Sequence, residues 1–330
     1  MGILSVIEST ARENDSDSNM TSRRAPRIEK MATEINIYGM LCITTVAMVG
    51  GFLYGFDIGA TSFVIVMLLN PPEIEHSSVA YWWLNLSSTR QGLVVSGLSL
   101  GALIGSIVLI YLSKHIGRRM ELRLCAMFYM IGAILNVTSG TVLKERSVGG
   151  FLCLCLGRVL YGIGVGFVMH GAPAYLAEMS PHRIRGAVVS AKETVIVGGI
   201  VAGYMVGNNM STDPLGWIKL YGLCGLMALP MFALTYYVPR STRWLLMHGL
   251  HQEAYESMKF MYIGNFKNEY EALVNGVCAG KKSTSTTTDY REPSLFELRY
   301  RKAIFASMGL IFFQQFSGQP RYVRTIIIML

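Results

Sequence analysis

The sequence predicts an all-α membrane protein built from a bundle of transmembrane helices. Hydrophobic residues make up 52% of the chain and charged residues 15%, and the mean hydropathy is +0.39, a composition too apolar for an ordinary soluble domain. The apolar residues gather in stretches of roughly 20, the length a helix needs to cross a hydrocarbon core about 30 Å thick. Basic residues gather in alternate connections between these stretches, as in polytopic membrane proteins.

Six stretches are long enough to span the membrane, and a seventh begins near the C-terminus. Their predicted bounds are Ile37–Phe56, Leu93–Leu112, Leu122–Val137, Phe151–Tyr175, Ala187–Val206, Leu220–Val238 and Ala303–Phe316. The third and fifth are short, so polar residues at their ends, such as Glu121 and Lys192, are expected to reach the membrane surface. We expect a disordered tail over residues 1–36, a six-span bundle over 37–238 and a partial seventh span over 303–330.

The distribution of basic residues predicts the orientation. About 22 of the 29 lysines and arginines lie in the tail and in the connections after the second, fourth and sixth stretches, against about 4 in the other connections. Because basic residues resist translocation, the N-terminus is predicted to be cytoplasmic. The net charge of +8 then belongs to cytoplasmic loops and implies no nucleic-acid partner. The glycosylation sequons at Asn85, Asn136 and Asn209 fall on the opposite side.

The connection between the sixth and seventh stretches, residues 239–302, is too long for a simple link in a helical bundle. Apolar residues such as Trp244, Ala254 and Met258 recur at three- and four-residue spacing, which predicts short amphipathic helices at the cytoplasmic surface. The run from Lys281 to Asp289 has the composition of a flexible linker. Six spans, a long inner connection and a further span are typical of transporters in which two repeated halves are joined.

Two ionisable residues fall at membrane depth, where a charge costs at least about 2.5–3.5 kcal/mol on insertion scales. Asp57 follows Gly-Phe-Leu-Tyr-Gly-Phe at the end of the first stretch, and Arg158 lies inside the fourth. Protonation of Asp57 would free Arg158 and change which packing of the helices is favoured. A static ion pair that orients two helices is the alternative, and both interpretations stay open at this point.

Short motifs recur at characteristic places along the chain. They are Gly117-Arg118-Arg119, Gly162-x-Gly164-x-Gly166, Tyr175-Leu-Ala-Glu178, Pro181-x-x-Ile184-Arg185-Gly186, Arg243-Trp244-Leu245 and Gln314-Gln315-x-x-Gly318. In residues and spacing, from roughly Tyr38 to Pro320, the chain resembles the sugar porters of the major facilitator superfamily. The runs Met169-His170-Gly171-Ala172-Pro173 and Phe316-Ser317-Gly318-Gln319-Pro320 are similar to plant members described as D-xylose-proton symporter-like.

The resemblance implies a sugar transporter that works by alternating access, with a monosaccharide as substrate, the proton as coupling ion and no other cofactor. Asp57 would accept the proton and Arg158 would be its partner. Substrate-binding residues would be Gln314, Gln315 and Gln319, since an amide offers both a donor and an acceptor to sugar hydroxyls.

One position departs from the family pattern in the expected sugar site. Glu193 stands where many sugar porters have a substrate-binding glutamine. Its carboxylate would contact the sugar as an acceptor or pair with Lys192 or another cation, and both roles stay open.

The resemblance also implies a cytoplasmic gate, a charge network that closes the inner side while the transporter faces outward. Its members would be Arg118, Arg119, Glu178, Arg185 and Arg243. Two departures weaken it: Arg240 replaces a usual glutamate, and Ser113-Lys114-His115 replaces the acidic start of the loop after the second span. Solvated surface pairs are the alternative. His170, near the end of the fourth stretch, is expected to be a packing or hydrogen-bonding residue rather than a proton relay.

Other functional classes fit less well. A rhodopsin-like receptor would place the N-terminus outside, against the distribution of basic residues, whereas a sugar sensor without transport activity fits the same motifs. An enzyme is not expected, because the sequence has no Ser/His/Asp set, metal cluster or phosphate loop in a plausible setting. The membrane itself is not specified, and the plasma, vacuolar and plastid membranes all remain open.

The resemblance stops after Pro320. Arg321 and Arg324 then fall where a seventh span would continue through lipid, at about 5–7 kcal/mol on the insertion scale. The expectation from the sequence is a truncated chain that lacks the C-terminal bundle as its partner and is inactive alone.

Overall fold

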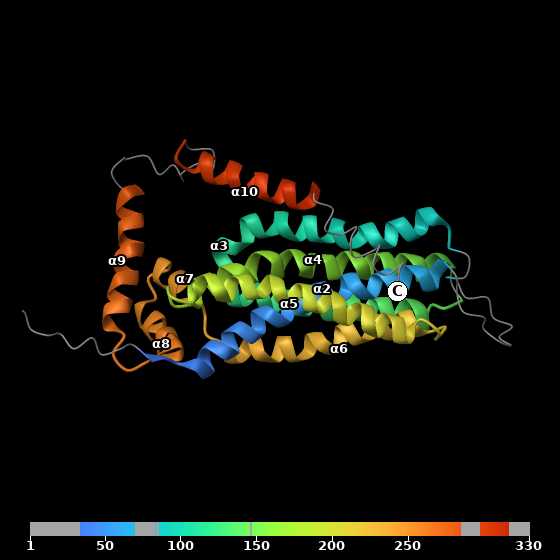
Figure 1. Ribbon diagram of the computed structural model, residues 1–330, viewed down its shortest axis with the longest axis horizontal. Helices are drawn as coiled ribbons and strands as arrows, with labels where there is room; N and C mark the ends of the chain where they lie inside the picture. The colour runs from blue at the N-terminus through green and yellow to red at the C-terminus, as the bar shows by residue number, and fades with distance from the viewer. Residues whose placement is uncertain (1–33, 70–82, 84–85, 146, 285–297, 317–330) are drawn as a thin grey trace, which may run out of the picture. The chain divides into compact units, whose positions relative to one another are not determined.

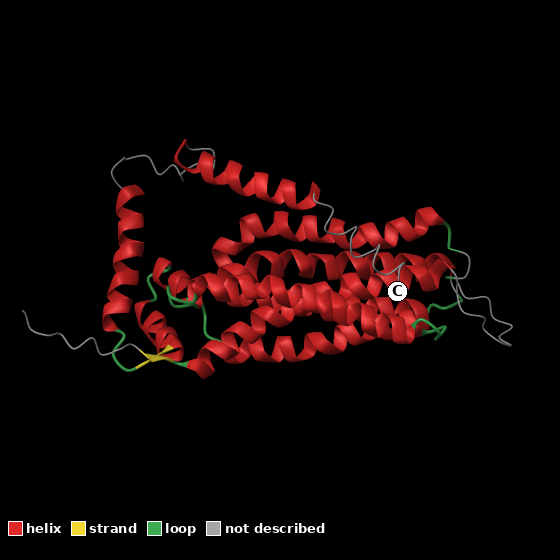
Figure 2. Cartoon of the chain, viewed as in Figure 1, coloured by secondary structure: helices red, strands yellow, loops and turns green. Residues whose placement is uncertain are grey.

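The computed structural model describes residues 34–69, 83, 86–145, 147–284 and 298–316. Nearly all of these residues are helical (Figure 2). Contacts divide the chain into two units, Met1–Glu34 and Ile35–Leu330, and every helix of the described residues lies in the second. Within that unit, α2 to α6 lie side by side as a bundle (Figure 1).

The bundle helices are α2 (Ile37–Leu69), α3 (Ser88–Thr141), α4 (Ser147–Met179), α5 (Arg185–Met210) and α6 (Gly216–Tyr237). They are followed by α7 (Thr242–Met247), α8 (His251–Met261), α9 (Lys267–Thr284) and α10 (Leu298–Phe316). Two short strands, β1 (Glu34–Ile35) and β2 (Tyr262–Ile263), form a two-stranded sheet.

Six segments are long and apolar enough to cross a membrane, which confirms the predicted six-span, all-α membrane fold. They are Ile37–Leu68, Ser88–Ser113, His115–Thr141, Val148–Met179, Arg185–Met210 and Gly216–Tyr237. All six are longer than predicted, and the first continues 12 residues beyond Phe56. The prediction ended this span immediately before Asp57, where a charge interrupts the apolar run, but that charge is paired inside the bundle. The predicted seventh span corresponds to α10, whose apolar part, Ile304–Phe313, is shorter than a span.

Two spans are joined within α3 by a sharp bend at Gly117. This residue has φ 68° and ψ 162°, a conformation that a residue with a Cβ rarely adopts. A Cβ there would also lie 3.0 Å from the ring of Trp244. The bend therefore needs glycine both for its backbone and for the packing of α7 against it.

The backbones of α2 and α5 are in direct contact. A Cβ on Gly55 would lie 2.0 Å from the carbonyl oxygen of Ile196, and one on Gly203 would lie 2.4 Å from that of Phe56. Small residues at such contacts let membrane helices pack closely without a hydrophobic driving force. This contact brings α5 against the segment of α2 that carries Asp57.

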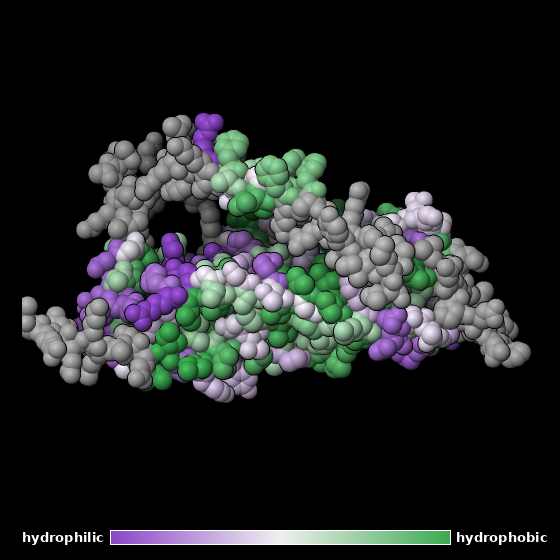
Figure 3. Space-filling model, in the orientation of Figure 1, coloured by the Kyte–Doolittle hydropathy of each residue, from purple (hydrophilic) through white to green (hydrophobic). Residues whose placement is uncertain are grey.

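The outer surface of the bundle is apolar along its length. Exposed side chains include Leu103 and Ile107 on α3 and Val201 and Met205 on α5. Figure 3 shows hydrophobic surface along the helices and hydrophilic side chains gathered toward their two ends. Such a surface is suited to lipid, and the chain is an integral, multi-pass membrane protein.

The polar residues predicted at the ends of the short spans are buried. Glu121 and Lys192 have almost no exposed surface, their helices begin earlier than predicted, and they pair with Arg118 and Glu193 respectively. Asn136 is also buried, within α3, so its sequon is not accessible for glycosylation. Asn209 is exposed in the last turn of α5, and Asn85 lies outside the described residues.

The predicted helices of the long connection are present as α7, α8 and α9. The helix α9 extends to Thr284, so the first part of the run predicted to be flexible, Lys281–Asp289, is helical; its last five residues lie outside the described ranges. We call the end of the bundle where α4 and α6 end the linker end, because α7 follows α6 there. The start of α2 lies at the same end, with Gly39 against Phe260 of α8.

Candidate functional site

The centre of the bundle holds an ion pair between α2 and α4. The guanidinium of Arg158 donates from Nη1 to Oδ1 of Asp57 at 2.6 Å and from Nη2 to Oδ2 at 3.0 Å. Both side chains have no exposed surface. A forked pair of this kind is strong and fixes both side chains in one orientation. The structure thus brings together the two residues that the sequence placed at membrane depth.

Arg158 also contacts α3 and α6. Its Nε donates to the carbonyl oxygen of Val94 on α3 at 3.4 Å, and its guanidinium carbon lies 5.1 Å from the ring centre of Tyr221 on α6. Gly97 leaves space for it, since a Cβ there would lie 3.2 Å from the Cβ of Arg158. One arginine therefore connects α4 with α2, α3 and α6.

Two tyrosines hold the part of α2 that precedes Asp57. Tyr129 of α3 and Tyr161 of α4 are stacked with ring centres 4.4 Å apart. Tyr129 donates to the carbonyl of Gly50 at 3.4 Å, and Tyr161 donates to that of Leu53 at 3.3 Å. Leu53 is four residues before Asp57, so its carbonyl is also the helical acceptor for the Asp57 backbone N–H. Neither tyrosine was predicted from the sequence, because a tyrosine within an apolar stretch cannot be distinguished there from an ordinary core residue.

The departure at Glu193 has a defined geometry. Glu193 forms an ion pair with Lys192, with 2.9 Å between Oε1 and Nζ. The side chain of Glu193 is 62% exposed, whereas that of Lys192 is 4% exposed. The carboxylate thus has the local partner that the sequence offered as one alternative, and it still has surface free for a further contact.

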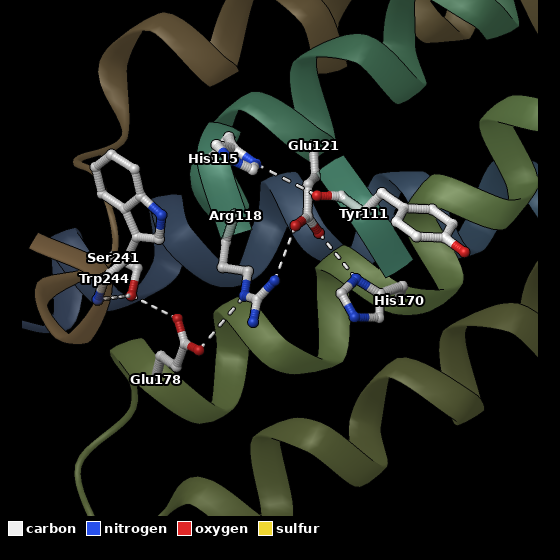
Figure 4. A network of polar contacts seen from close by, with 8 residues as sticks. All are labelled: Tyr111, His115, Arg118, Glu121, His170, Glu178, Ser241 and Trp244. Atoms are coloured by element: carbon white, nitrogen blue, oxygen red, sulfur yellow. Dashed lines mark hydrogen bonds and ion pairs between the residues drawn. The ribbon is translucent and has the colours of Figure 1, made fainter. Parts of the chain in front are cut away.

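A second group of charges lies at the linker end (Figure 4). Arg118 donates from Nη1 to Oε1 of Glu121 at 2.8 Å and from Nε to Oε1 of Glu178 at 3.4 Å. The other oxygen of Glu178 accepts the hydroxyl of Ser241 at 2.5 Å. That hydroxyl in turn accepts the backbone N–H of Trp244 at 3.3 Å, as the N-cap of α7. The group links α3, α4 and the start of α7.

The other three gate candidates do not join this group. Arg119 donates to the carbonyl of Val238 at 3.1 Å, and Arg185 donates to that of Ser180 at 3.3 Å. Arg243 is exposed on α7, and it makes no ion pair with the other candidates in the described part of the chain. Among the residues that the structure describes, Arg118 and Glu178 are the only two of the five predicted members that form an ion pair with each other.

The expected sugar contacts from the seventh span are described only in part. Gln314 and Gln315 belong to the last turn of α10, but the placement of their side chains lies outside what is described, as does Gln319 altogether. A shallow surface hollow of about 460 Å³ lies at the linker end, lined by Arg119, Arg240 and residues of α7 and α8. The described residues contain no group of three or more His, Cys, Asp or Glu side chains that could hold a metal ion.

Comparisons with known proteins agree with this architecture. The profile of a family described as "Sugar (and other) transporter" matches residues 43–321. The chain is 34% identical to "D-xylose-proton symporter-like 2" of Arabidopsis thaliana, over 95% of this chain and 62% of that protein. It is 31% identical to "Glucose transporter GlcP" of Staphylococcus epidermidis, over 82% and 54%.

A solved structure has the same arrangement of helices. The proton:xylose symporter XylE, bound to 6-bromo-6-deoxy-D-glucose, matches with a TM-score of 0.64 and 26% identity, over 76% of this chain and 55% of the XylE chain; XylE is a protein of E. coli. The chain therefore spans about three fifths of the length of these proteins.

Proposed function

The chain belongs to the sugar transporter family of the major facilitator superfamily, and from this premise we propose that it serves proton-coupled transport of a monosaccharide across a membrane. Asp57 and Arg158 are the coupling pair in this proposal. The observation that carries it is a forked ion pair without exposed surface, in the centre of a membrane bundle. Ionisable groups at this depth are costly and are mostly found where an ion or substrate uses them.

The coupling step follows from the contacts of Arg158. A proton on Asp57 removes the charge that holds the guanidinium, and Arg158 then keeps only the carbonyl of Val94 on α3 and the ring of Tyr221 on α6. The link from α4 to α2 weakens while the links to α3 and α6 persist. A change in protonation therefore biases the packing of α2 against α4, which is the kind of two-state element that alternating access requires.

We assign sugar recognition to the exposed Glu193 and to three glutamines of the seventh span. The exposed carboxylate of Glu193 can accept hydrogen bonds from sugar hydroxyls, and the amides of Gln314, Gln315 and Gln319 can both donate and accept. Transporters of this design bind substrate between two repeated bundles. We therefore assign the second side of the sugar site to a partner bundle that packs against the face carrying Glu193.

The linker-end charges form the cytoplasmic gate in this proposal, with Arg118 and Glu178 as the pair that links α3 to α4. The positive-inside distribution supports the cytoplasmic location of this end. An impermeant thiol reagent applied to intact cells should reach a cysteine placed at position 85 and not one at position 289. The reverse labelling would overturn the orientation.

The coupling role is tested by Asp57→Asn in the natural full-length protein reconstituted in liposomes. Asparagine keeps the size of the side chain and cannot release a proton at this position. We expect uptake against a sugar gradient to be abolished while exchange of sugar at equal concentrations persists. The matched control is Asp213→Asn, which alters an exposed aspartate between α5 and α6 and should leave uptake unchanged.

Other outcomes would change the proposal in defined ways. Unchanged concentrative uptake by the Asp57→Asn variant would make the ion pair a static connection between helices. Sugar binding without any exchange, in the unaltered protein, would point to a sensor instead of a transporter.

A further inference from the structure

We propose that Glu121 and His170 are two further members of the cytoplasmic gate: Glu121 is the carboxylate that holds Arg118, and His170 is a positioning residue that holds Glu121. The inference adds two residues to the proposed gate, and the expected effect on sugar transport rests on the proposed function. Neither residue belongs to the gate expected from the sequence, where the loop Ser113-Lys114-His115 offered no acid for Arg118.

Glu121 is the more deeply buried of the two carboxylates in the linker-end group (Figure 4). It has no exposed surface, and each of its oxygens has a different partner: Oε1 accepts from Nη1 of Arg118 at 2.8 Å, and Oε2 lies 3.0 Å from Nδ1 of His170. Arg118 lies closer to Glu121 than to Glu178, at 2.8 Å against 3.4 Å. A buried carboxylate costs several kcal/mol unless it is paired and hydrogen-bonded, so both contacts are needed.

His170 reaches Glu121 from a different helix. A carboxylate only accepts hydrogen bonds, so Nδ1 of His170 carries the hydrogen in this contact. The next residue, Gly171, makes room for it, because a Cβ there would lie 3.0 Å from Oε2 of Glu121. The His-Gly pair on α4 thus provides a donor for one oxygen and the space that this oxygen occupies.

The charges of the group explain why a third donor matters. One guanidinium, that of Arg118, faces two carboxylates, Glu121 and Glu178. The hydroxyl of Ser241 donates to Glu178, and the ring of His170 does the same for Glu121. Nearby His115 takes no part, since its Nδ1 lies 3.3 Å from the backbone carbonyl of Tyr111 (Figure 4).

The contacts form a continuous path from α4 to α7. They run from His170 through Glu121, Arg118 and Glu178 to Ser241, which caps α7. The ring of Trp244 on α7 in turn packs against Gly117, at the bend of α3. Loss of the hydrogen bond from His170 should therefore loosen α7 although that helix lies outside the spans.

The test uses His170→Leu, which removes the donor, and His170→Gln, whose amide restores one. Hydrogen–deuterium exchange of Thr242–Met247 is measured in the purified full-length protein, together with the turnover of sugar exchange in liposomes. We expect His170→Leu to speed amide exchange in α7 and to slow sugar turnover, each about 5- to 10-fold, which matches the net contribution of one typical hydrogen bond. His170→Gln should stay within about 2-fold of the unaltered protein for both readouts.

Two further variants separate positioning from general damage. His115→Gln, a neighbouring histidine outside the path, should change neither readout. Combining His170→Leu with Glu121→Gln should have no larger effect than Glu121→Gln alone, because His170 acts through Glu121. If Glu121→Gln fails to fold, the comparison of the two His170 variants still decides the question.

The inference and the proposed function can fail separately. Equal α7 exchange in His170→Leu and the unaltered protein, failure of His170→Gln to restore it, or full additivity with Glu121→Gln would each overturn the positioning role. An altered α7 with restoration by His170→Gln, in a protein that moves no sugar, would uphold the positioning role and refute transport.

Discussion

The ion pair in the centre of the bundle and the charge group at the linker end solve the same problem, holding charges between helices, in opposite ways. Asp57 and Arg158 have no exposed surface and one ionic partner each. At the linker end Arg118 has two carboxylate partners, and the side chains of Arg118 and Glu178 are 21% and 17% exposed. The first is a closed pair, and the second is a shared network open to water on one side.

The difference determines how each group responds to the loss of a member. In the closed pair, water cannot replace a lost partner, so the remaining charge stays buried and unpaired. In the open network, water and the remaining members compensate in part, and a link between partly exposed side chains such as Arg118 and Glu178 contributes little alone. A closed pair is therefore suited to a switch that a single proton operates, and an open network to a gate that must form and break readily.

The largest expected effect is on the closed pair. Arg158→Met leaves Asp57 buried without a partner and should lower the free energy of unfolding by about 3–5 kcal/mol. The double variant Asp57→Leu/Arg158→Met removes both charges and should recover most of that loss. Reversible unfolding in mixed micelles measures both. A double variant as unstable as the single one would mean that the pocket itself, with Val94 and Tyr221, requires a charge.

An intermediate effect is expected within the network. Glu178→Gln keeps the shape of a partly exposed side chain and should lower the free energy of unfolding by about 0.5–1 kcal/mol. Glu121→Gln alters a buried carboxylate with two partners and should cost about 1–3 kcal/mol. The same unfolding measurement ranks them. Equal costs for the two variants would remove the distinction between a buried centre and an exposed rim in this group.

The fold could be predicted from the sequence because hydrophobic stretches of membrane length are a strong signal. The ends of the helices could not, since they depend on partners. Asp57 stops an apolar run in the sequence, yet α2 continues past it because Arg158 neutralises the charge. Glu121 and Lys192 were expected at the ends of short spans, but their helices begin earlier and both side chains are buried beside Arg118 and Glu193.

The closed pair was predictable because two isolated charges in apolar stretches have few alternatives to pairing. The network was predictable only in part, because many polar residues near the helix ends could pair in several ways. Glu121 could have been found from its position three residues after Arg118 on one helix. Its contact with His170 could not, because 49 residues separate them and only the packing at Gly171 brings them together.

The smallest expected effect extends the comparison to a solvent-exposed pair, Asp213 in the connection after α5 and Lys219 at the start of α6. Their side chains are 34% and 56% exposed. The hydrogen bond from Lys219, with a second from the backbone N–H of Leu215 at 3.0 Å, lowers the pKa of Asp213 below its usual range. A lowered pKa stabilises the folded protein above the unfolded pKa of about 3.9, and this stability is lost as the pH falls through the folded value.

Because the pair is solvated, Asp213→Asn should cost only about 0.5 kcal/mol at pH 6 and nothing at a pH below both pKa values. Unfolding at the two pH values, with a titration of the Asp213 carboxyl by NMR, tests this. A cost that persists at low pH, or a midpoint at or above the usual value, would show that the connection depends on the shape of the side chain and not on its charge.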